Sequence, residues 1–90
     1  MTVGPRLEGR VALITGASWG IGAAVAKAFA GEGASVVVSS YPDPEMERLA
    51  DGVVRSIVDA GGRAIRASAD VTSPAQIAAV VELARSEFGD

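Results

Sequence analysis

A short apolar segment leads directly into a glycine-rich turn, and an amphipathic helix pattern follows at once. Residues 11–14 are all apolar, residues 15–22 read TGASWGIG, and apolar positions recur at helical spacing over residues 21–30. A strand, a turn and a helix in this order aim backbone N–H groups and the positive end of a helix dipole at one point. The pattern therefore predicts a turn that binds phosphate without a basic side chain.

The three glycines of this turn have the spacing G-x-x-x-G-x-G, and each has an expected task. Gly16 lets the chain leave the strand sharply, Gly20 lets backbone lie against a pyrophosphate, and Gly22 brings the helix close to the sheet. Ile21, between the last two glycines, favours this interpretation over a tight turn without any ligand, which is the alternative. A P-loop is excluded because no Gly-Lys-Ser/Thr follows and Lys27 falls well inside the helix.

The rest of the chain alternates strand and helix patterns. Apolar strand patterns cover residues 36–38 and 64–69. Helices are expected to begin after Asp43 and after Ser73, each followed by a proline, and SPAQ at residues 73–76 predicts a capping box. Glycines end the helices, the first of them at Gly31 or Gly33.

The order βαβαβα predicts an α/β fold: the first half of a Rossmann-type doubly wound parallel sheet, with strand order 3-2-1. We expect one dinucleotide-binding half domain over residues 1–90, with residues 1–9 as a flexible lead-in and no second domain. In the complete fold the first strand is central. Here it is expected to form an exposed apolar edge, which promotes association.

Composition excludes several kinds of function. Neither histidine nor cysteine occurs, so a Ser-His dyad, a thiolate metal site and a disulfide framework are excluded, and no metal site is expected. The formal net charge is −3, which argues against a nucleic-acid partner. No apolar run approaches the roughly 20 residues of a membrane span, and residues 1–8 do not resemble a secretory signal. A cytoplasmic protein is therefore expected.

At the glycine turn and at several other segments, the chain resembles the short-chain dehydrogenase/reductase family. The run TGASWGIG has the form of the family's nucleotide motif, and Asp70-Val71 is similar to its adenine-contacting acidic residue and neighbour. Residues 7–15 resemble the entry into the family's first strand, and residues 87–90 resemble the run before its fourth strand. The nearest resemblance within the family is to 3-oxoacyl-carrier-protein reductases.

The resemblance implies an oxidoreductase that binds a nicotinamide dinucleotide, NAD(P)(H), acts on a carbonyl/alcohol pair and forms a homo-oligomer. Asp70 is expected to accept a hydrogen bond from the adenine amino group; the alternative is a solvated residue before the next helix. Ser18 is expected to bind the ribose or a phosphate, or else to satisfy the backbone of its own turn.

Cofactor preference is expected to be set at the end of the second strand, where a carboxylate would bind the ribose 2′-hydroxyl and repel a 2′-phosphate. Ser40 stands where NAD-preferring relatives carry Asp, which favours NADP(H) over NAD(H). Trp19 stands where NADP-preferring relatives often carry Arg; it is expected to wall the adenosine or merely to cover the turn. Asp43 and Glu45 would oppose a phosphate if they faced it; the interpretation we favour is that they serve the N-terminus of the next helix.

No catalytic residue is assigned. The family's Tyr-x-x-x-Lys pair is missing, since the only tyrosine, Tyr41, is followed four residues later by Glu45. The sequence thus predicts the cofactor-binding portion of an oxidoreductase, inactive by itself, with the catalytic part outside this chain. Two alternatives stay open: a non-catalytic nucleotide-binding module that self-associates along its first strand, and a domain with no ligand.

Overall fold

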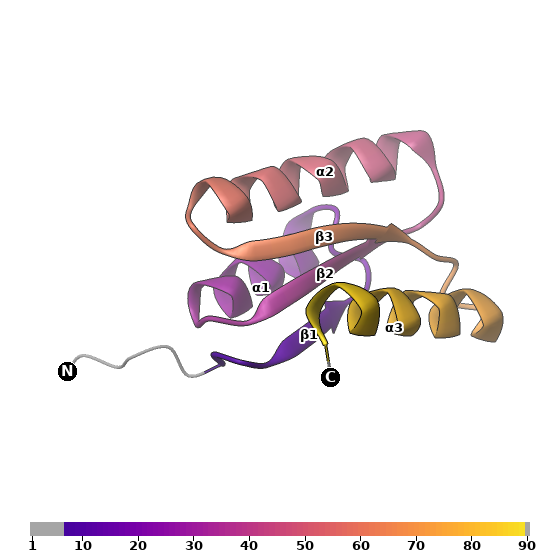
Figure 1. The fold of residues 1–90 in the computed structure, drawn as a ribbon. Coiled ribbons are helices and arrows are strands. Elements are labelled where there is room, and N and C mark those ends of the chain that lie inside the picture. Colours follow the sequence, from indigo (N-terminus) through magenta and orange to yellow (C-terminus); the bar gives the residue numbers. More distant parts are fainter. Residues whose placement is uncertain (1–6, 90) are drawn as a thin grey trace.

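Residues 7–89 are described by a computed structural model, in which helices cover both faces of a three-stranded parallel sheet (Figure 1). The elements are, in chain order, β1 (Val11–Ile14), α1 (Gly20–Gly31), β2 (Ser35–Ser40), α2 (Pro44–Asp59), β3 (Arg63–Ser68) and α3 (Pro74–Phe88). The sheet order is β1-β2-β3, which is the predicted 3-2-1 order counted from the other edge. The βαβαβα Rossmann-type half is confirmed.

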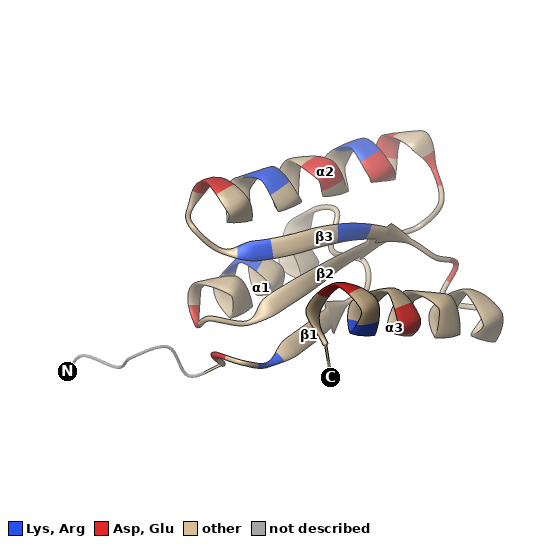
Figure 2. Ribbon diagram, in the orientation of Figure 1, with Lys and Arg blue, Asp and Glu red and all other residues tan. Residues whose placement is uncertain are grey.

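β2 forms the centre of the sheet, and all six of its residues are buried. It pairs in parallel on both sides, so that Val36 lies between Ala12 of β1 and Ala64 of β3. A strand that reads Ser-Val-Val-Val-Ser-Ser without polar alternation is typical of a strand covered on both faces. Figure 2 shows that β2 carries no charged residue, whereas charges of both signs gather on α2.

Two separate apolar clusters lie on the two faces of the sheet. The face covered by α1 and α2 includes alternate β2 residues, Val36 and Val38, together with Ala26 and Ile57. The other face, covered by α3, includes Val37, and α3 lies in front of the sheet in Figure 1. Arg66 and Ser68 of β3 lie on the α2 side of the sheet, where they bind Asp51 and Glu47.

α2 and α3 begin after Asp43 and Ser73, as predicted, but the predicted capping box at the start of α3 forms only in part. Ser73 Oγ accepts a hydrogen bond from Gln76 N–H at 3.3 Å, which is one half of the predicted capping box. The reciprocal half does not form. Ser73 N–H instead donates to Asp70 O at 2.9 Å, and Gln76 Oε1 accepts from Asp70 N–H at 2.7 Å. Because Ser73 N–H is already bound to Asp70 O, the side-chain oxygen of Gln76 is left to bind Asp70 N–H, just after the end of β3.

One edge of the sheet is β1, as expected, and the other is β3. All four residues of β1 are only half buried, and an open hollow of about 470 Å³ runs along that strand. The hollow is lined by residues of β1 and of the segments that flank it: Leu7, Arg10, Val11, Ala12, Leu13, Ile14, Phe29 and Ala34.

The expected lead-in, residues 1–9, lies outside the described residues over its first six positions. In the described part, Leu7 N–H donates to Glu32 O at 2.7 Å, and Leu7 packs against the core cluster on the α1 side. The chain therefore contacts the end of α1 before it enters β1. α1 itself ends with Gly31 as its last helical residue, and Gly33 adopts the left-handed conformation at φ 97°.

Candidate functional site

The turn between β1 and α1 depends on its glycines for conformation and for space. Gly16 and Gly20 have φ angles of 61° and 63°, in the left-handed region that residues with a Cβ rarely adopt. A Cβ on Gly22 would lie 2.2 Å from Gly16 O. We expected the close approach at Gly22 to be made with the sheet. The structure shows that it is made with the turn itself, which folds back against the first turn of α1.

The N-terminus of α1 differs from those of α2 and α3. Its N-cap residue, Trp19, makes no side-chain capping hydrogen bond, and its first turn carries no acidic residue. By contrast, Asp43 Oδ2 accepts from Glu45 N–H and Met46 N–H, both at 3.1 Å, at the start of α2. The first N–H groups of a helix have no partner within the helix. The first N–H groups of α1, which follow the glycine turn directly, therefore have no side-chain cap.

A hollow lies at the carboxyl ends of the strands, beside the glycine turn. Ala17 N–H donates to Ser39 O at 3.1 Å and so ties the turn to the end of β2. The hollow has a volume of about 270 Å³, and it is lined by the residues that end β1, β2 and β3: Thr15, Gly16, Ser39, Ser40, Tyr41, Ala69 and Val71. It brings together three of the predicted site residues, Gly16, Ser40 and Val71. Carboxyl ends of parallel strands are the usual ligand-binding edge of such sheets.

Four large apolar side chains are exposed in the segments that form this edge. The exposed fractions are 66% for Trp19, 85% for Ile21, 57% for Tyr41 and 61% for Val71. Exposed apolar groups gathered in one region are typical of a ligand or interaction site. Sequence reasoning excluded Tyr41 from a Tyr-x-x-x-Lys pair and did not predict its place in the hollow. Its position directly after the second strand was the available signal.

Two predicted serines are buried at the same edge, with unexpected surroundings. Ser18 is 6% exposed, and its Oγ donates to Met46 Sδ at 3.4 Å, a partner that neither sequence interpretation named. Ser40 is 1% exposed. Its Oγ has no hydrogen-bond partner among the residues that the structure describes.

Asp70 lies half-buried just after β3, and its carboxylate is held by Thr72. Asp70 Oδ1 accepts hydrogen bonds from Thr72 Oγ1 at 2.6 Å and from Thr72 N–H at 2.9 Å. These bonds, the one from the hydroxyl first, lower the pKa of Asp70 below its ordinary value. The carboxyl is therefore ionised at neutral pH, as an acceptor for an amino group must be.

Thr72→Val is expected to raise the pKa of Asp70 toward its ordinary value, because the hydroxyl donor is lost while the backbone donor stays. A carboxyl with a lowered pKa in the folded state contributes stability above its unfolded pKa, and that stability is lost as pH falls through the folded pKa. The change is measured by following the Asp70 carboxyl carbon by NMR between pH 2 and 7 (about the range that brackets an Asp titration). Thr72→Ser keeps the hydroxyl and should leave the pKa low. Equal pKa values in Thr72→Val and the parent would contradict the assignment.

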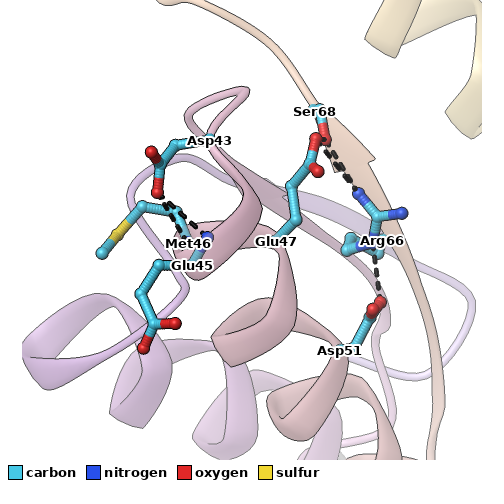
Figure 3. Close-up of polar contacts among 7 residues, drawn as sticks. All are labelled: Asp43, Glu45, Met46, Glu47, Asp51, Arg66 and Ser68. Atoms are coloured by element: carbon cyan, nitrogen blue, oxygen red, sulfur yellow. Dashed lines mark hydrogen bonds and ion pairs between the residues drawn. The ribbon is translucent and has the colours of Figure 1, made fainter.

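Two carboxylates of α2 are bound by side chains of β3 (Figure 3). Arg66 Nε donates to Asp51 Oδ1 at 2.6 Å, and Ser68 Oγ donates to Glu47 Oε2 at 2.7 Å. Arg66 Nη1 also donates to Ser68 Oγ at 2.8 Å, so this network joins the start of α2 to β3.

Asp43 and Glu45 are engaged locally. Asp43 caps α2, and the hydrogen bond and charge of Arg48 lower the pKa of Glu45. This agrees with the expectation that both serve the second helix.

Within residues 7–89, no three acidic, histidine or cysteine side chains are grouped so as to hold a metal ion. No helix in the same range is long and apolar enough to span a membrane. What the site offers is a turn of backbone N–H groups, two buried hydroxyls, one ionised carboxylate and an apolar rim.

Comparison with known proteins gives a consistent picture. The family profile described as short chain dehydrogenase matches residues 10–90. An uncharacterized oxidoreductase of Methylorubrum extorquens is 51% identical over 84 residues, which are 93% of this chain and 33% of that protein. Cis-4-hydroxycyclohexanecarboxylate dehydrogenase of Sinomonas cyclohexanicum is 41% identical over 97% of this chain and 33% of its own length.

The fold comparison agrees. The crystal structure of a hydroxysteroid dehydrogenase from Escherichia coli superposes with a TM-score of 0.86 at 41% identity, covering 94% of this chain and 34% of that one. The chain therefore spans about a third of the length of the relatives that it matches.

Proposed function

The chain belongs to the short-chain dehydrogenase family, and on that premise we propose that it is the NAD(P)(H)-binding portion of an oxidoreductase acting on a carbonyl/alcohol pair. The family uses nicotinamide dinucleotides, and its named relatives are oxidoreductases and dehydrogenases. Because the chain spans about a third of their length, activity on a substrate is proposed for the whole protein.

One observation carries the proposal: the glycine turn packs against the first turn of a helix that has no side-chain cap. The contact at Gly22 leaves no room for a side chain, so the N–H groups of the turn and of the first turn of α1 stay close to one another. Such clustered donors, with the positive end of the helix dipole behind them, bind a diphosphate. Capping α1 with Asp or Ser, as in α2 and α3, would have served stability alone.

We assign the predicted site residues to the successive parts of the dinucleotide, beginning with its pyrophosphate. We assign the phosphates to the backbone at Gly16, Gly20 and Gly22. The hollow at Val71 and the free oxygen of the Asp70 carboxylate suit an adenine ring with its amino group. We assign Trp19 and Ile21 to the walls of the nucleotide site, and the hydroxyls of Ser18 and Ser40 to the ribose.

NADP(H) is proposed over NAD(H). The position at the end of β2 carries the hydroxyl of Ser40 and no carboxylate, so the usual repulsion of a 2′-phosphate is missing. The nearby Asp43 and Glu45 are engaged by the α2 backbone and by Arg48. Their charges are therefore partly neutralised.

The chemistry of the reaction is the cofactor's, namely hydride transfer between nicotinamide and the substrate carbon. This chain's residues hold and orient the nucleotide, and none of them is assigned a catalytic role. The resemblance to 3-oxoacyl-carrier-protein reductases, the homo-oligomer and the cytoplasmic location stay predictions. A self-associating, non-catalytic nucleotide-binding module remains the alternative.

The proposal is tested by titrating the purified protein with NADPH and NADH while following the fluorescence of Trp19, the only tryptophan. Gly20→Val should weaken NADPH binding by about tenfold or more, because a branched side chain would enter the space of the pyrophosphate and lose about 1.4 kcal/mol or more. The matched control is Gly9→Val. Gly9 has a similar left-handed φ of 83° and equally open surroundings, but it lies before β1 at the amino end of the sheet.

Equal loss of affinity in the two variants would show that backbone strain, and not the site, explains the effect. A parent protein that binds neither dinucleotide would contradict the proposed function. Binding that appears only in a concentration-dependent oligomer would favour the self-associating module.

A further inference from the structure

Two charged side chains meet at the end of β3, which lies beside Ser40, the residue assigned to the nucleotide ribose. Ser40 and Ser68 are register partners, and each is the last residue of its strand. Ala69 N–H donates to Ser40 O at 2.9 Å, so the ends of β2 and β3 are tied together. Ser68 Oγ donates to Glu47 Oε2 at 2.7 Å and accepts from Arg66 Nη1 at 2.8 Å. One side chain, that of Ser68, therefore separates these two charged groups from Ser40.

Ser40, Ser68 and Arg66 lie on the same face of the sheet. Alternate residues of a strand share a face, so Ser40 is on the side of Val38, which packs in the cluster covered by α1 and α2. Ser68 and Arg66 are on that side too, because they bind carboxylates of α2. Figure 3 shows the Glu47 side chain reaching from α2 to Ser68. The charges of Glu47 and Arg66 are thus presented on the side of the sheet to which Ser40 belongs.

The Glu47–Arg66 pair is less exposed than the neighbouring ion pair of α2. The exposed fraction is 34% for both side chains, against 69% for Arg48 and 57% for Glu45. Water screens exposed charges strongly, so a half-buried pair has the larger effect on a nearby ligand. The two charges also do not cancel fully. Arg66 Nη1 lies 3.8 Å from Glu47 Oε2, and Arg66 Nε donates to Asp51 Oδ1 at 2.6 Å, so one guanidinium is shared between two carboxylates.

We propose that Glu47 and Arg66 together set the strength of the preference for NADP(H), with Arg66 favouring the 2′-phosphate and Glu47 opposing it. This rests on the proposed function, in which the ribose lies at Ser40. A phosphate monoester carries a charge of about −1.5 to −2 at neutral pH, whereas the 2′-hydroxyl of NAD(H) carries none. The pyrophosphate is common to both cofactors. A fixed charge beside Ser40 therefore changes NADPH binding more than NADH binding. Each side chain acts through its charge, and neither is assigned as a ligand of the nucleotide.

The test is the ratio of the NADPH and NADH dissociation constants in Glu47→Gln and Arg66→Gln, measured by titration of the Trp19 fluorescence. Glu47→Gln should shift the ratio toward NADPH by about threefold to fivefold, the size expected when one charge near a dianion is removed across partly solvated protein. Arg66→Gln should shift it toward NADH by a similar factor. Both substitutions weaken the same network, so a purely structural role would not give shifts of opposite sign. Any result other than opposite shifts would overturn the proposal.

Two control variants separate the charges from the geometry of the network and from the total charge of the protein. Ser68→Ala removes both hydrogen bonds of the hydroxyl and keeps both charges, so it should lower thermal stability and leave the ratio within about twofold of the parent. Glu82→Gln removes a carboxylate from α3, which covers the other face of the sheet, and should leave the ratio unchanged. A shift in Glu82→Gln equal to that in Glu47→Gln would overturn the proposal, because the total charge would then explain both.

The titrations also distinguish this inference from the proposed function. A parent protein that binds both dinucleotides, with Glu47 and Arg66 variants that do not shift in opposite directions, would leave the proposed function standing and remove the role of the pair. A parent that binds neither dinucleotide would remove both.

Discussion

Gly22→Ala is expected to lower the free energy of unfolding by about 3 kcal/mol, in the upper range for overpacking a buried position. The added Cβ would lie 2.2 Å from Gly16 O and 2.9 Å from Gly16 C, and both atoms are backbone. A flexible side chain could rotate away from such an overlap, but the turn cannot. Relief requires α1 to move off the turn, which disturbs the donors proposed to hold the pyrophosphate. Urea unfolding followed by circular dichroism measures the loss of stability, and NADPH titration measures the loss of binding.

The control for this substitution is Gly52→Ala, in the interior of α2. A Cβ on Gly52 meets nothing within 4 Å, and the residue is exposed. Alanine there should raise the free energy of unfolding by about 1 kcal/mol, the difference in helix propensity between the two residues. The two glycine-to-alanine changes thus have opposite expected signs. A stable Gly22→Ala protein would show that the turn can open away from the helix.

The arrangement of strands and helices was predictable because it depends on local patterns. The apolar run at residues 36–38 marked a strand buried on both faces, and β2 occupies the centre of the sheet. Pro44 and Pro74 marked the first residues of α2 and α3, since a proline lacks only an N–H that would be unpaired there. The parallel order then followed from the rule that such crossovers are right-handed.

The prediction failed where a group had more than one possible partner. Ser73 and Gln76 match a capping box by spacing, but Asp70 lies close enough to take both the Ser73 donor and the Gln76 acceptor. Spacing along a sequence ranks the partners within one turn of helix. It does not show which competing group the preceding loop brings within reach.

Gly16, Ser40 and Val71 were predicted as site residues and line one hollow, but the surroundings of the two serines could not be predicted. Ser18 contacts Met46, 28 residues away in sequence, because the start of α2 returns to the glycine turn. The burial of Ser40, whose hydroxyl has no hydrogen-bond partner among the described residues, likewise depends on how the elements pack around the end of β2. These are properties of packing between elements, and no local pattern encodes them.

Ser40→Asp is expected to reverse the cofactor preference. A carboxylate at the end of β2 would face the 2′-phosphate of NADPH, and juxtaposed like charges cost several kcal/mol, so NADPH affinity should fall by about thirtyfold, or about 2 kcal/mol. The same carboxylate can accept hydrogen bonds from the ribose hydroxyls of NADH, so NADH should be retained. The readout is the ratio of the two dissociation constants, which is insensitive to any general loss of folded protein.

Ser40→Asn separates charge from size in this prediction. Asparagine has nearly the shape of aspartate and no charge, so it should weaken both cofactors to a similar extent and leave their ratio near that of the parent. If Ser40→Asn changed the ratio as much as Ser40→Asp, steric exclusion would be the cause, and the proposed preference for NADP(H) would lose its electrostatic basis. If neither variant changed the ratio, the 2′-phosphate would bind away from the end of β2, and the assignment of Ser40 to the ribose would be wrong.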